Sequence, residues 1–268
     1  MRVGGRVVAI TGAGSGIGRA LAELAARRGA HLALADVDPK GLAETRERVS
    51  GSPGRVSTHV VDVADEAAVR TFAAAAVSAH GGVDVLVNNA GVALYGSVLE
   101  IASDEFAWLM NVNFWGVVYG VKAFLPALLQ RPEAAIVNVS SLFGLWAPPG
   151  QSAYAASKFA VRGFGESLRG ELLDTNVHVM TVHPAGIATA IARSARVAAA
   201  VDPAVAAART KAFEERFLTI APADAASAIL DGLERKRDRL LIGREARRVD
   251  VLTRLLGPHA ARLFARRV

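Results

Sequence analysis

The sequence predicts a single-domain α/β protein with a doubly wound parallel sheet. Short, β-rich apolar runs alternate with segments of helical periodicity along most of the 268 residues, a pattern typical of parallel strands covered by helices on both faces. A glycine-rich turn joins the first apolar run to the first helical segment. No repeat or low-complexity linker divides the chain, so we expect one domain over residues 1–268.

The expected elements follow one another in regular order. Strands are expected to end at Thr11, Asp36, Val63, Asn89, Ser141, Pro184 and Gly243. Helices are expected over Ile17–Arg28, Gly41–Val49, Glu66–His80, Asp104–Gln130 and Ala153–Leu173. A less regular stretch over 189–219 and a basic helical tail over 244–268 complete the chain. Right-handed crossovers between the parallel strands give a doubly wound fold. In such open sheets ligands bind beyond the carboxyl ends of the strands, so we expect the candidate site residues there.

Composition excludes several classes of function. Cysteine is absent, which excludes disulfides and thiolate chemistry, and the six histidines lack metal-ligand spacing, so we expect no metal. No stretch reaches the roughly 18 uninterrupted apolar residues of a membrane span, and the N-terminus lacks a signal-peptide pattern. We therefore expect a cytoplasmic protein.

The net charge of +6 is concentrated in the C-terminal part of the chain. No aromatic and basic strand pattern accompanies it, so we expect no nucleic-acid partner. The tail has apolar residues at helical spacing, namely Val249, Val251, Leu252, Leu255 and Leu256. A basic amphipathic helix is compatible with contact to an anionic membrane, but we expect this one to pack on its own body or on a neighbouring subunit.

The stretch TGAGSGIG, Thr11–Gly18, predicts a phosphate-binding turn. Its glycines let the backbone approach a diphosphate, and the following helix N-terminus favours negative charge. Asp36 ends the next strand, where an acidic residue binds the adenosine ribose hydroxyls and repels a 2′-phosphate. Neither Ser15 nor Val37 offers a cation for that phosphate, so we predict NAD rather than NADP. The alternative for Asp36 is a cap on the next helix.

Tyr154 and Lys158 lie one turn apart in SAYAASKFAV, so they share a helix face. Alone, the pair is also compatible with a half-exposed tyrosine beside a solvated lysine. An unperturbed phenol, with a pKa of about 10, is too weakly ionised to act as a base near neutrality. A lysine cation one turn away favours the phenolate, as does the nicotinamide cation of NAD⁺.

These motifs together resemble the short-chain dehydrogenase/reductase family in its single-domain Rossmann form. The matching elements are TGxxxGxG at Thr11–Gly18, NNAG at Asn88–Gly91, and SS followed by YAASK. The resemblance is strong from Gly5 to Thr189 and looser beyond. It implies an NAD(P)-dependent oxidoreductase that forms a homodimer or homotetramer through the long helices Asp104–Gln130 and Ala153–Leu173.

The resemblance also implies the catalytic roles. Tyr154 corresponds to the acid/base, Lys158 to its partner, and Ser141 to the serine that binds the substrate oxygen. Asn113, in NVNFWG, corresponds to an asparagine that distorts a helix and holds a water linked to the lysine. Asn111 is the competing choice, and the phenylalanine and glycine downstream favour Asn113.

The resemblance implies a larger set of cofactor contacts, which cluster after successive strands. They are Gly12, Gly14, Ser15, Gly16, Ile17, Gly18, Asp36, Asp62, Val63, Asn89, Ala90, Gly91, Tyr154, Lys158, Pro184, Gly186, Ile187 and Thr189. The sixth strand departs from the family pattern, because Ala185 in HPAGIAT stands where the family has its first glycine. Gly186 follows at once, so we expect the loop to bend there.

The candidate pocket walls are apolar. They comprise Leu94, Tyr95, Phe143, Leu145 and Trp146 around Ser141 and Tyr154, and the segment LFGLWAPPGQSA carries no charge. Residues 190–217 correspond to the family's substrate lid. We therefore expect a lipophilic secondary alcohol or ketone as substrate. One alternative is a 3-oxoacyl thioester reductase using NADPH, against which Asp36 argues. Another is a dinucleotide sensor without catalysis, against which the retained Asn113, Ser141, Tyr154 and Lys158 argue.

Overall fold

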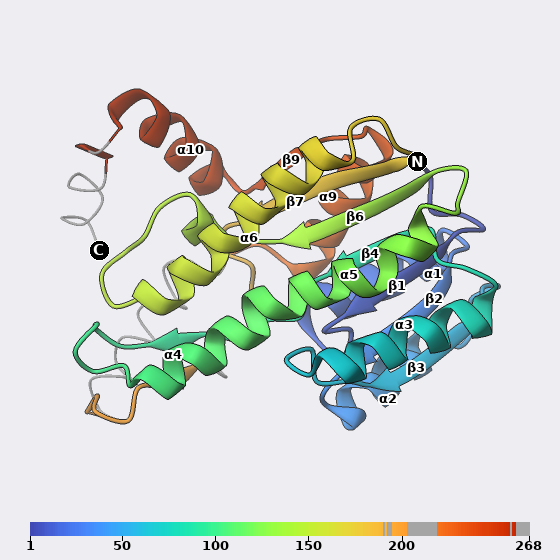
Figure 1. The fold of residues 1–268 in the computed structure, drawn as a ribbon, viewed down its shortest axis with the longest axis horizontal. Coiled ribbons are helices and arrows are strands. Elements are labelled where there is room, and N and C mark those ends of the chain that lie inside the picture. Colours follow the sequence, from blue (N-terminus) through green and yellow to red (C-terminus); the bar gives the residue numbers. More distant parts are fainter. Residues whose placement is uncertain (190, 192–194, 203–218, 258, 261–268) are drawn as a thin grey trace.

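The computed structural model describes the chain except residues 190, 192–194, 203–218, 258 and 261–268. Much of the expected lid and the end of the tail lie outside the described residues. A seven-stranded sheet with the order β3-β2-β1-β4-β6-β7-β9 forms the centre of the fold (Figure 1). Every neighbouring pair in it is parallel. The predicted doubly wound α/β class is confirmed.

The strands correspond to the seven apolar runs. Their bounds are β1 Val7–Thr11, β2 His31–Asp36, β3 Val56–Val60, β4 Val85–Asn88, β6 Ala134–Val139, β7 Val177–Pro184 and β9 Arg239–Ile242. β4 and β9 end one residue earlier than expected, and two strands end earlier still: β3 stops at Val60 before Val63 and β6 at Val139 before Ser141. In both, the last residues of the run leave the ladder and enter the loops at the carboxyl edge of the sheet.

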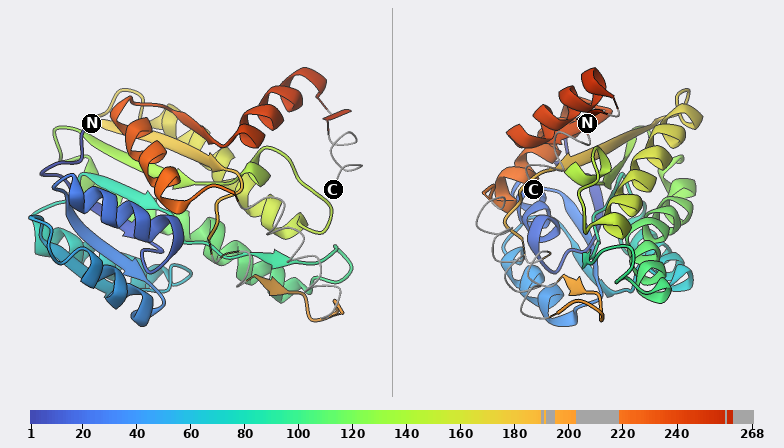
Figure 2. Two further views of the ribbon diagram at one scale, coloured as in Figure 1. Left: turned by 180° about the vertical axis from the view of Figure 1, so that it is seen from behind. Right: turned by 90° about the vertical axis from the view of Figure 1, so that its left-hand side faces the viewer.

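Helices cover both faces of the sheet (Figures 1 and 2). The first face carries α1 Gly16–Arg27, α2 Pro39–Arg48 and α9 Pro222–Glu234. The other carries α3 Glu66–His80, α5 Gly116–Leu128 and α6 Ser152–Glu171. Alternate strand residues point to the two faces: Val8 and Ile10 to the first, Val7 and Ala9 to the second. The sequence analysis did not predict α9, which packs beside α1.

The expected long helix Asp104–Gln130 is interrupted. It consists of α4 Ser103–Met110, a π-helical turn over Asn111–Trp115 and then α5. The side chain of Asn113 lies in this turn with no exposed surface. A widened turn of this kind changes the direction in which side chains project and often marks a functional site.

Two features lie beyond the main sheet. β5 Leu94–Tyr95 pairs with β8 Arg196–Val197, which anchors the described start of the expected lid segment. The tail begins with α10 Arg244–Leu256, whose buried face includes Ala246 and Val249. The described helix of the tail, α10, therefore packs on the body, as expected. In the part of the chain that the structure describes, every helix is too short or too polar to cross a membrane.

Candidate active site

The carboxyl ends of β1, β2, β4, β6 and β7 bring the predicted site residues to one edge of the sheet. The glycine turn follows β1 there and leads directly into α1. Gly12 and Gly16 have positive φ angles of 67° and 52°, a conformation that glycine adopts without steric penalty. A Cβ on Gly12 would lie 2.8 Å from the Cα of Ala90, so this turn packs tightly on the loop after β4.

The first turn of α1 is open at its N-terminus. Ser15 is the N-cap residue, but its side chain makes no capping hydrogen bond, and it is exposed. The uncapped backbone N–H groups and the helix dipole favour an anion at this point. The turn thus has the geometry that a diphosphate requires.

Asp36 lies beside the glycine turn rather than on the next helix. Its Oδ2 accepts a hydrogen bond from the backbone N–H of Gly14 at 2.7 Å, and its Oδ1 accepts one from Asp38 N at 2.9 Å. The N-cap of α2 is Asp38, which accepts from Lys40 N. The alternative interpretation of Asp36 as the cap of α2 is therefore wrong.

The loops after β4 and β7 close around the glycine turn. Asn89 donates from Nδ2 to the carbonyls of Thr11 and Gly12 at 2.9 and 3.1 Å, so its side-chain amide braces the turn. A Cβ on Gly16 would lie 3.1 Å from Cγ2 of Thr189, which brings the loop after β7 against the turn. Gly186 has a φ of 67°, so the bend expected after Ala185 occurs at this glycine.

The remaining predicted cofactor contacts lie on the same edge. Asp62 and Val63 lie in the loop after β3. Asp62 is exposed, and Val63 is buried against Gly116 of α5. The backbone at Gly91 lies close to two predicted catalytic side chains, because a Cβ there would lie 3.2 Å from Asn113 Oδ1 and 3.4 Å from Lys158 Nζ. The glycine turn, the open N-terminus of α1 and the carboxylate of Asp36 at the end of β2 together fit a dinucleotide such as NAD.

Ser141, Tyr154 and Lys158 meet where the end of β6 faces α6. Lys158 is 3% exposed, and its Nζ donates to the carbonyl of Val139 at 3.1 Å. The same Nζ lies 5.7 Å from the ring centroid of Tyr154. The Ser141 side chain lies beside the Tyr154 phenol, where its hydroxyl acts to lower the pKa of that group. Tyr154 is partly exposed, whereas Lys158 is buried, so the solvated lysine considered from the sequence is wrong.

Three consecutive residues at the end of β6 contact this pair. Besides the carbonyl of Val139, the hydroxyl of Ser140 donates to the carbonyl of Lys158 at 2.8 Å. Ser141 caps the short 3₁₀ turn Leu142–Gly144, and its Oγ accepts from Phe143 N at 3.1 Å. With that acceptor position used, the Ser141 hydroxyl proton is left to donate to a phenolic or substrate oxygen.

Burial dominates the titration of both groups. It raises the pKa of Tyr154, an effect that the nearby Ser141 hydroxyl opposes. It lowers the pKa of Lys158 to about 8. The sequence-based argument expected the lysine to lower the pKa of the phenol. In the structure desolvation instead raises the pKa of Tyr154, because the neutral phenol is favoured where water is excluded.

Asn113 connects the distorted helix to the loop after β4. Its Oδ1 accepts from Val92 N at 2.8 Å, and its Nδ2 donates to Val92 O at 3.0 Å and to Ser157 Oγ at 3.1 Å. The π-helical turn thus lies at the predicted asparagine. The water expected between Asn113 and Lys158 stays a prediction.

The predicted pocket wall divides into surface and core. Phe143 packs edge-on against Tyr154, with ring centroids 6.1 Å apart. The ring of Tyr95 is partly buried and lies beside Gly150. Leu94 has no exposed surface and packs with Leu109 and Ala153 behind Tyr154, which corrects its prediction as a substrate contact. Leu145 and Trp146 are also largely buried, in contact with α10.

Three residues near the site were missed by the sequence analysis. Arg19 donates to the Gly14 carbonyl, and its charge is paired with Glu44 at 2.9 Å. Ser140 was assigned no role from the sequence, yet its hydroxyl donates to the carbonyl of Lys158. The ring of His183 is fully buried, with Nδ1 3.1 Å from the Ser141 carbonyl. Burial lowers its pKa to about 4, so the neutral ring donates from Nδ1. Only their hydrogen-bond partners in the folded chain reveal these contacts.

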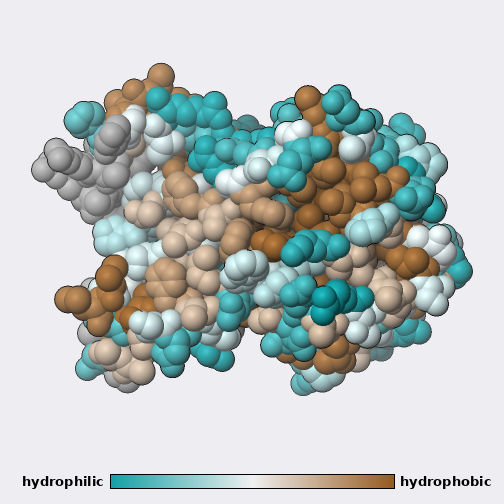
Figure 3. Space-filling model, in the orientation of Figure 1, coloured by the Kyte–Doolittle hydropathy of each residue, from teal (hydrophilic) through white to brown (hydrophobic). Residues whose placement is uncertain are grey.

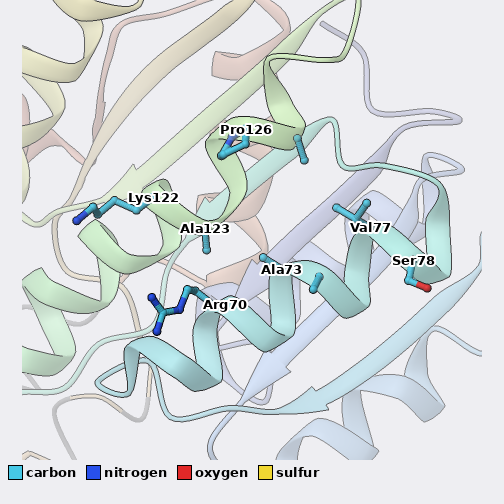
Figure 4. A pocket seen from close by; sticks show the side chains of 9 residues that line it. Arg70, Ala73, Val77, Ser78, Lys122, Ala123 and Pro126 are labelled. Carbon is cyan, nitrogen blue, oxygen red and sulfur yellow. The ribbon is translucent and has the colours of Figure 1, made fainter.

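A separate groove lies between α3 and α5, away from the predicted site (Figure 4). Its volume is about 570 Å³, and alanines, Val77 and Pro126 line it with Arg70 and Lys122. No predicted site residue contributes to its lining. Among the described residues, histidine and acidic side chains nowhere gather in a group of three that would hold a metal ion.

Comparisons with known proteins agree with this geometry. The family model for short chain dehydrogenases matches residues 6–199. SadH of Mycobacterium tuberculosis, named for an inferred oxidoreductase activity, is 46% identical over 263 residues, which cover 97% of this chain and 94% of SadH. A 3-oxoacyl-[acyl-carrier-protein] reductase, FabG of Thermotoga maritima, is 35% identical over 189 residues, 70% of this chain and 77% of FabG. A short-chain dehydrogenase/reductase of Burkholderia phymatum, crystallised with NAD, superposes with a TM-score of 0.87 at 34% identity over 95% of both chains.

Proposed function

The chain belongs to the short-chain dehydrogenase family, and we propose that it interconverts a lipophilic secondary alcohol and its ketone with NAD as cofactor. One observation carries the proposal. The fold brings Ser141, Tyr154 and Lys158 together where the end of β6 faces α6, with Lys158 buried and its Nζ donating to Val139 O at 3.1 Å. Such a hydroxyl pair beside a buried ammonium suits proton transfer to or from a substrate oxygen.

NAD is supported by the glycine turn, the open N-terminus of α1 and the carboxylate of Asp36. A 2′-phosphate near Asp36 would meet a like charge, and the nearby cation of Arg19 is already paired with Glu44. The structural relative from Burkholderia phymatum holds NAD. When bound, NAD⁺ supplies the hydride acceptor and a positive charge on its nicotinamide ring.

In the mechanism, Ser141 and Tyr154 hold the substrate oxygen. Ser141 donates its hydroxyl proton toward that oxygen, because Phe143 N occupies an acceptor position of Oγ. In alcohol oxidation the carbinol C–H bond breaks as hydride leaves, and the hydroxyl proton passes to Tyr154 Oη. In ketone reduction the same phenol gives its proton to the carbonyl oxygen.

Lys158 supplies charge at the point where the phenolate develops. With a pKa of about 8, its buried ammonium is mostly protonated at neutral pH. Because Tyr154 has a raised pKa in the chain alone, oxidation depends on the combined positive charge of Lys158 and of the bound cofactor. Gly91 lies close to this ammonium, because a Cβ there would lie 3.4 Å from Lys158 Nζ.

The substrate class follows from the apolar surroundings of Tyr154. Phe143 covers one edge of the tyrosine ring, and the loop from Leu142 to Ala153 carries no charged residue. A lipophilic alcohol would lose water on entering such a site at little cost. The likeness to FabG keeps a 3-oxoacyl thioester as the second candidate. The cytoplasmic location stays a prediction from the sequence.

The test is a panel of secondary alcohols of increasing apolar size and their ketones, assayed with NAD(H) and NADP(H) in parallel at 340 nm. We expect turnover with NAD(H) that improves with apolar size. Faster reduction of a 3-oxoacyl thioester with NADPH would replace this assignment with the second candidate. Tight NADH binding without turnover on any compound would instead support a dinucleotide sensor.

A further inference from the structure

The C-terminal helix has no part in the mechanism above, yet it lies against the loop that carries Phe143. Val249 of α10 is 7% exposed and forms an apolar cluster with Leu145 and Trp146, which are also buried. Leu142, Phe143 and Leu241 pack against this cluster. The tail thus covers the outer side of the loop whose inner side borders the candidate site.

Aromatic contacts connect this cluster to the tyrosine. The ring of Trp146 meets that of Phe143 with centroids 6.0 Å apart at an angle of 75°. Phe143 in turn meets Tyr154 at 6.1 Å and 88°. Edge-to-face pairs of this kind have a defined geometry, so a shift in one ring displaces the next. The contacts run from Val249 through Trp146 and Phe143 to Tyr154.

A partly buried ion pair fixes the orientation of α10. Asp250 accepts from Arg239 of β9 at 2.5 Å, with the two side chains 14% and 19% exposed, and Arg254 joins it at 3.2 Å. With Asp250 turned toward the sheet, Val249 faces the loop. Val251, two positions on, is 52% exposed. The helix therefore offers two valines in opposite environments. Figure 2 shows α10 extending from the body beside this loop.

We propose that Val249 is a positioning residue, through which the C-terminal helix holds Trp146 and Phe143 in place and so sets the Tyr154 ring and the width of the substrate pocket. The proposal rests on the proposed function for its kinetic consequence. The other part of the proposal, that α10 holds the Tyr154 ring in place, does not depend on the proposed function. The tail then determines which substrates fit, although it contacts neither substrate nor cofactor.

The experiment compares Val249→Ala with Val251→Ala, the same change on opposite faces of one helix, with Val249→Ile as the conservative variant. For Val249→Ala we expect kcat for the preferred alcohol to fall about tenfold and the preference to move toward bulkier alcohols. The Kd for NADH stays within twofold of wild type. Val251→Ala and Val249→Ile keep the wild-type profile. Equal kinetics in the two alanine variants would overturn the proposal.

A second readout needs no substrate. Phenol ionisation is followed by absorbance at alkaline pH, and the contribution of Tyr154 is isolated by subtracting the titration of Tyr154→Phe from each parent. Loosening of the loop admits water, so Val249→Ala is expected to move this ionisation toward that of an exposed tyrosine, while Val251→Ala leaves it in place. If no alcohol or ketone reacts with any variant, the proposed function fails, and this titration still decides the role of the tail. Identical Tyr154 titrations in the two variants would contradict it.

Discussion

At the scale of single residues, the account depends on a lysine that the fold buries. Lys158 is 3% exposed, and the backbone carbonyl of Val139 accepts from its Nζ. Burying an ammonium is unfavourable, which is why its pKa is lowered to about 8 from an ordinary 10.5. Lys158 thus destabilises the fold in the protonated form that the mechanism uses. Such a residue is better explained by a role in the chemistry than by a role in the structure.

This burial predicts a pH-dependent stability. Between pH 8 and 10.5 the unfolded chain binds a proton at Lys158 that the folded chain has lost, so the stability contribution of this residue rises with pH. Relative to Lys158→Met, the free energy of unfolding of the wild type should increase by about 3 kcal/mol over this window. Urea denaturation of both proteins at pH 7, 8, 9 and 10 measures it. A constant difference across the series would show that Lys158 is not desolvated as described.

At the scale of elements, the glycine turn is built by close packing. Gly18, in the first turn of α1, faces the carbonyl of Gly12, and a Cβ there would lie 2.6 Å from Nδ2 of Asn89. The turn, α1 and the loop after β4 thus have room for one another only because this position lacks a side chain. The shape of the cofactor site depends on that packing.

Gly18→Ala should therefore damage the cofactor site more than the rest of the fold. We expect NADH affinity to fall at least tenfold and stability to drop by about 1–3 kcal/mol, because the overpacked turn must move. Gly170→Ala is the matched control, since a Cβ at Gly170 meets nothing within 4 Å. Calorimetric titration with NADH and thermal unfolding compare the two. Unchanged affinity in Gly18→Ala would refute this view of the turn.

The sequence predicts elements well where one local pattern determines them. Alternation of apolar runs and helical segments indicated the strands of the sheet and their parallel pairing, and the bend at Gly186 followed from its glycine. The π-helical turn at Asn113 was expected only through the family resemblance. The short strand β8 and the helix α9 were missed, because tertiary pairing with β5 and packing on α1 stabilise them. Leu94 was predicted to line the pocket but lies in the core, because an apolar residue that follows a strand is compatible with either position.

At the scale of the whole molecule, the surface crossed by α5 and α6 is notably apolar (Figure 3). Trp115, Leu129 and Phe159 are 43%, 40% and 40% exposed, and a contiguous apolar surface commonly marks a protein interface. The family resemblance implies association through these helices. The apolar face and that resemblance together support a subunit interface on α5 and α6.

Replacing an apolar residue of this face by a charge should weaken self-association. We expect the wild type to elute as a dimer or tetramer in size-exclusion chromatography with light scattering, and Phe159→Arg to shift toward smaller species. Leu99→Arg, at a residue 97% exposed on a loop, should keep the wild-type mass. A wild type that is monomeric at assay concentration, or an unchanged mass in Phe159→Arg, would contradict this assignment of the interface.

The central claim is that Tyr154 transfers the substrate proton, and Tyr154→Phe tests it most directly. The variant keeps the ring and its edge-on contact with Phe143, and it removes only the hydroxyl. The measurement is kcat for the best alcohol with NAD⁺, with NADH binding followed by fluorescence in the same preparation. We predict a loss of at least about a hundredfold in kcat with NADH affinity retained, since general acid–base catalysis typically contributes about 10²–10⁴-fold. Turnover within tenfold of wild type would contradict the account.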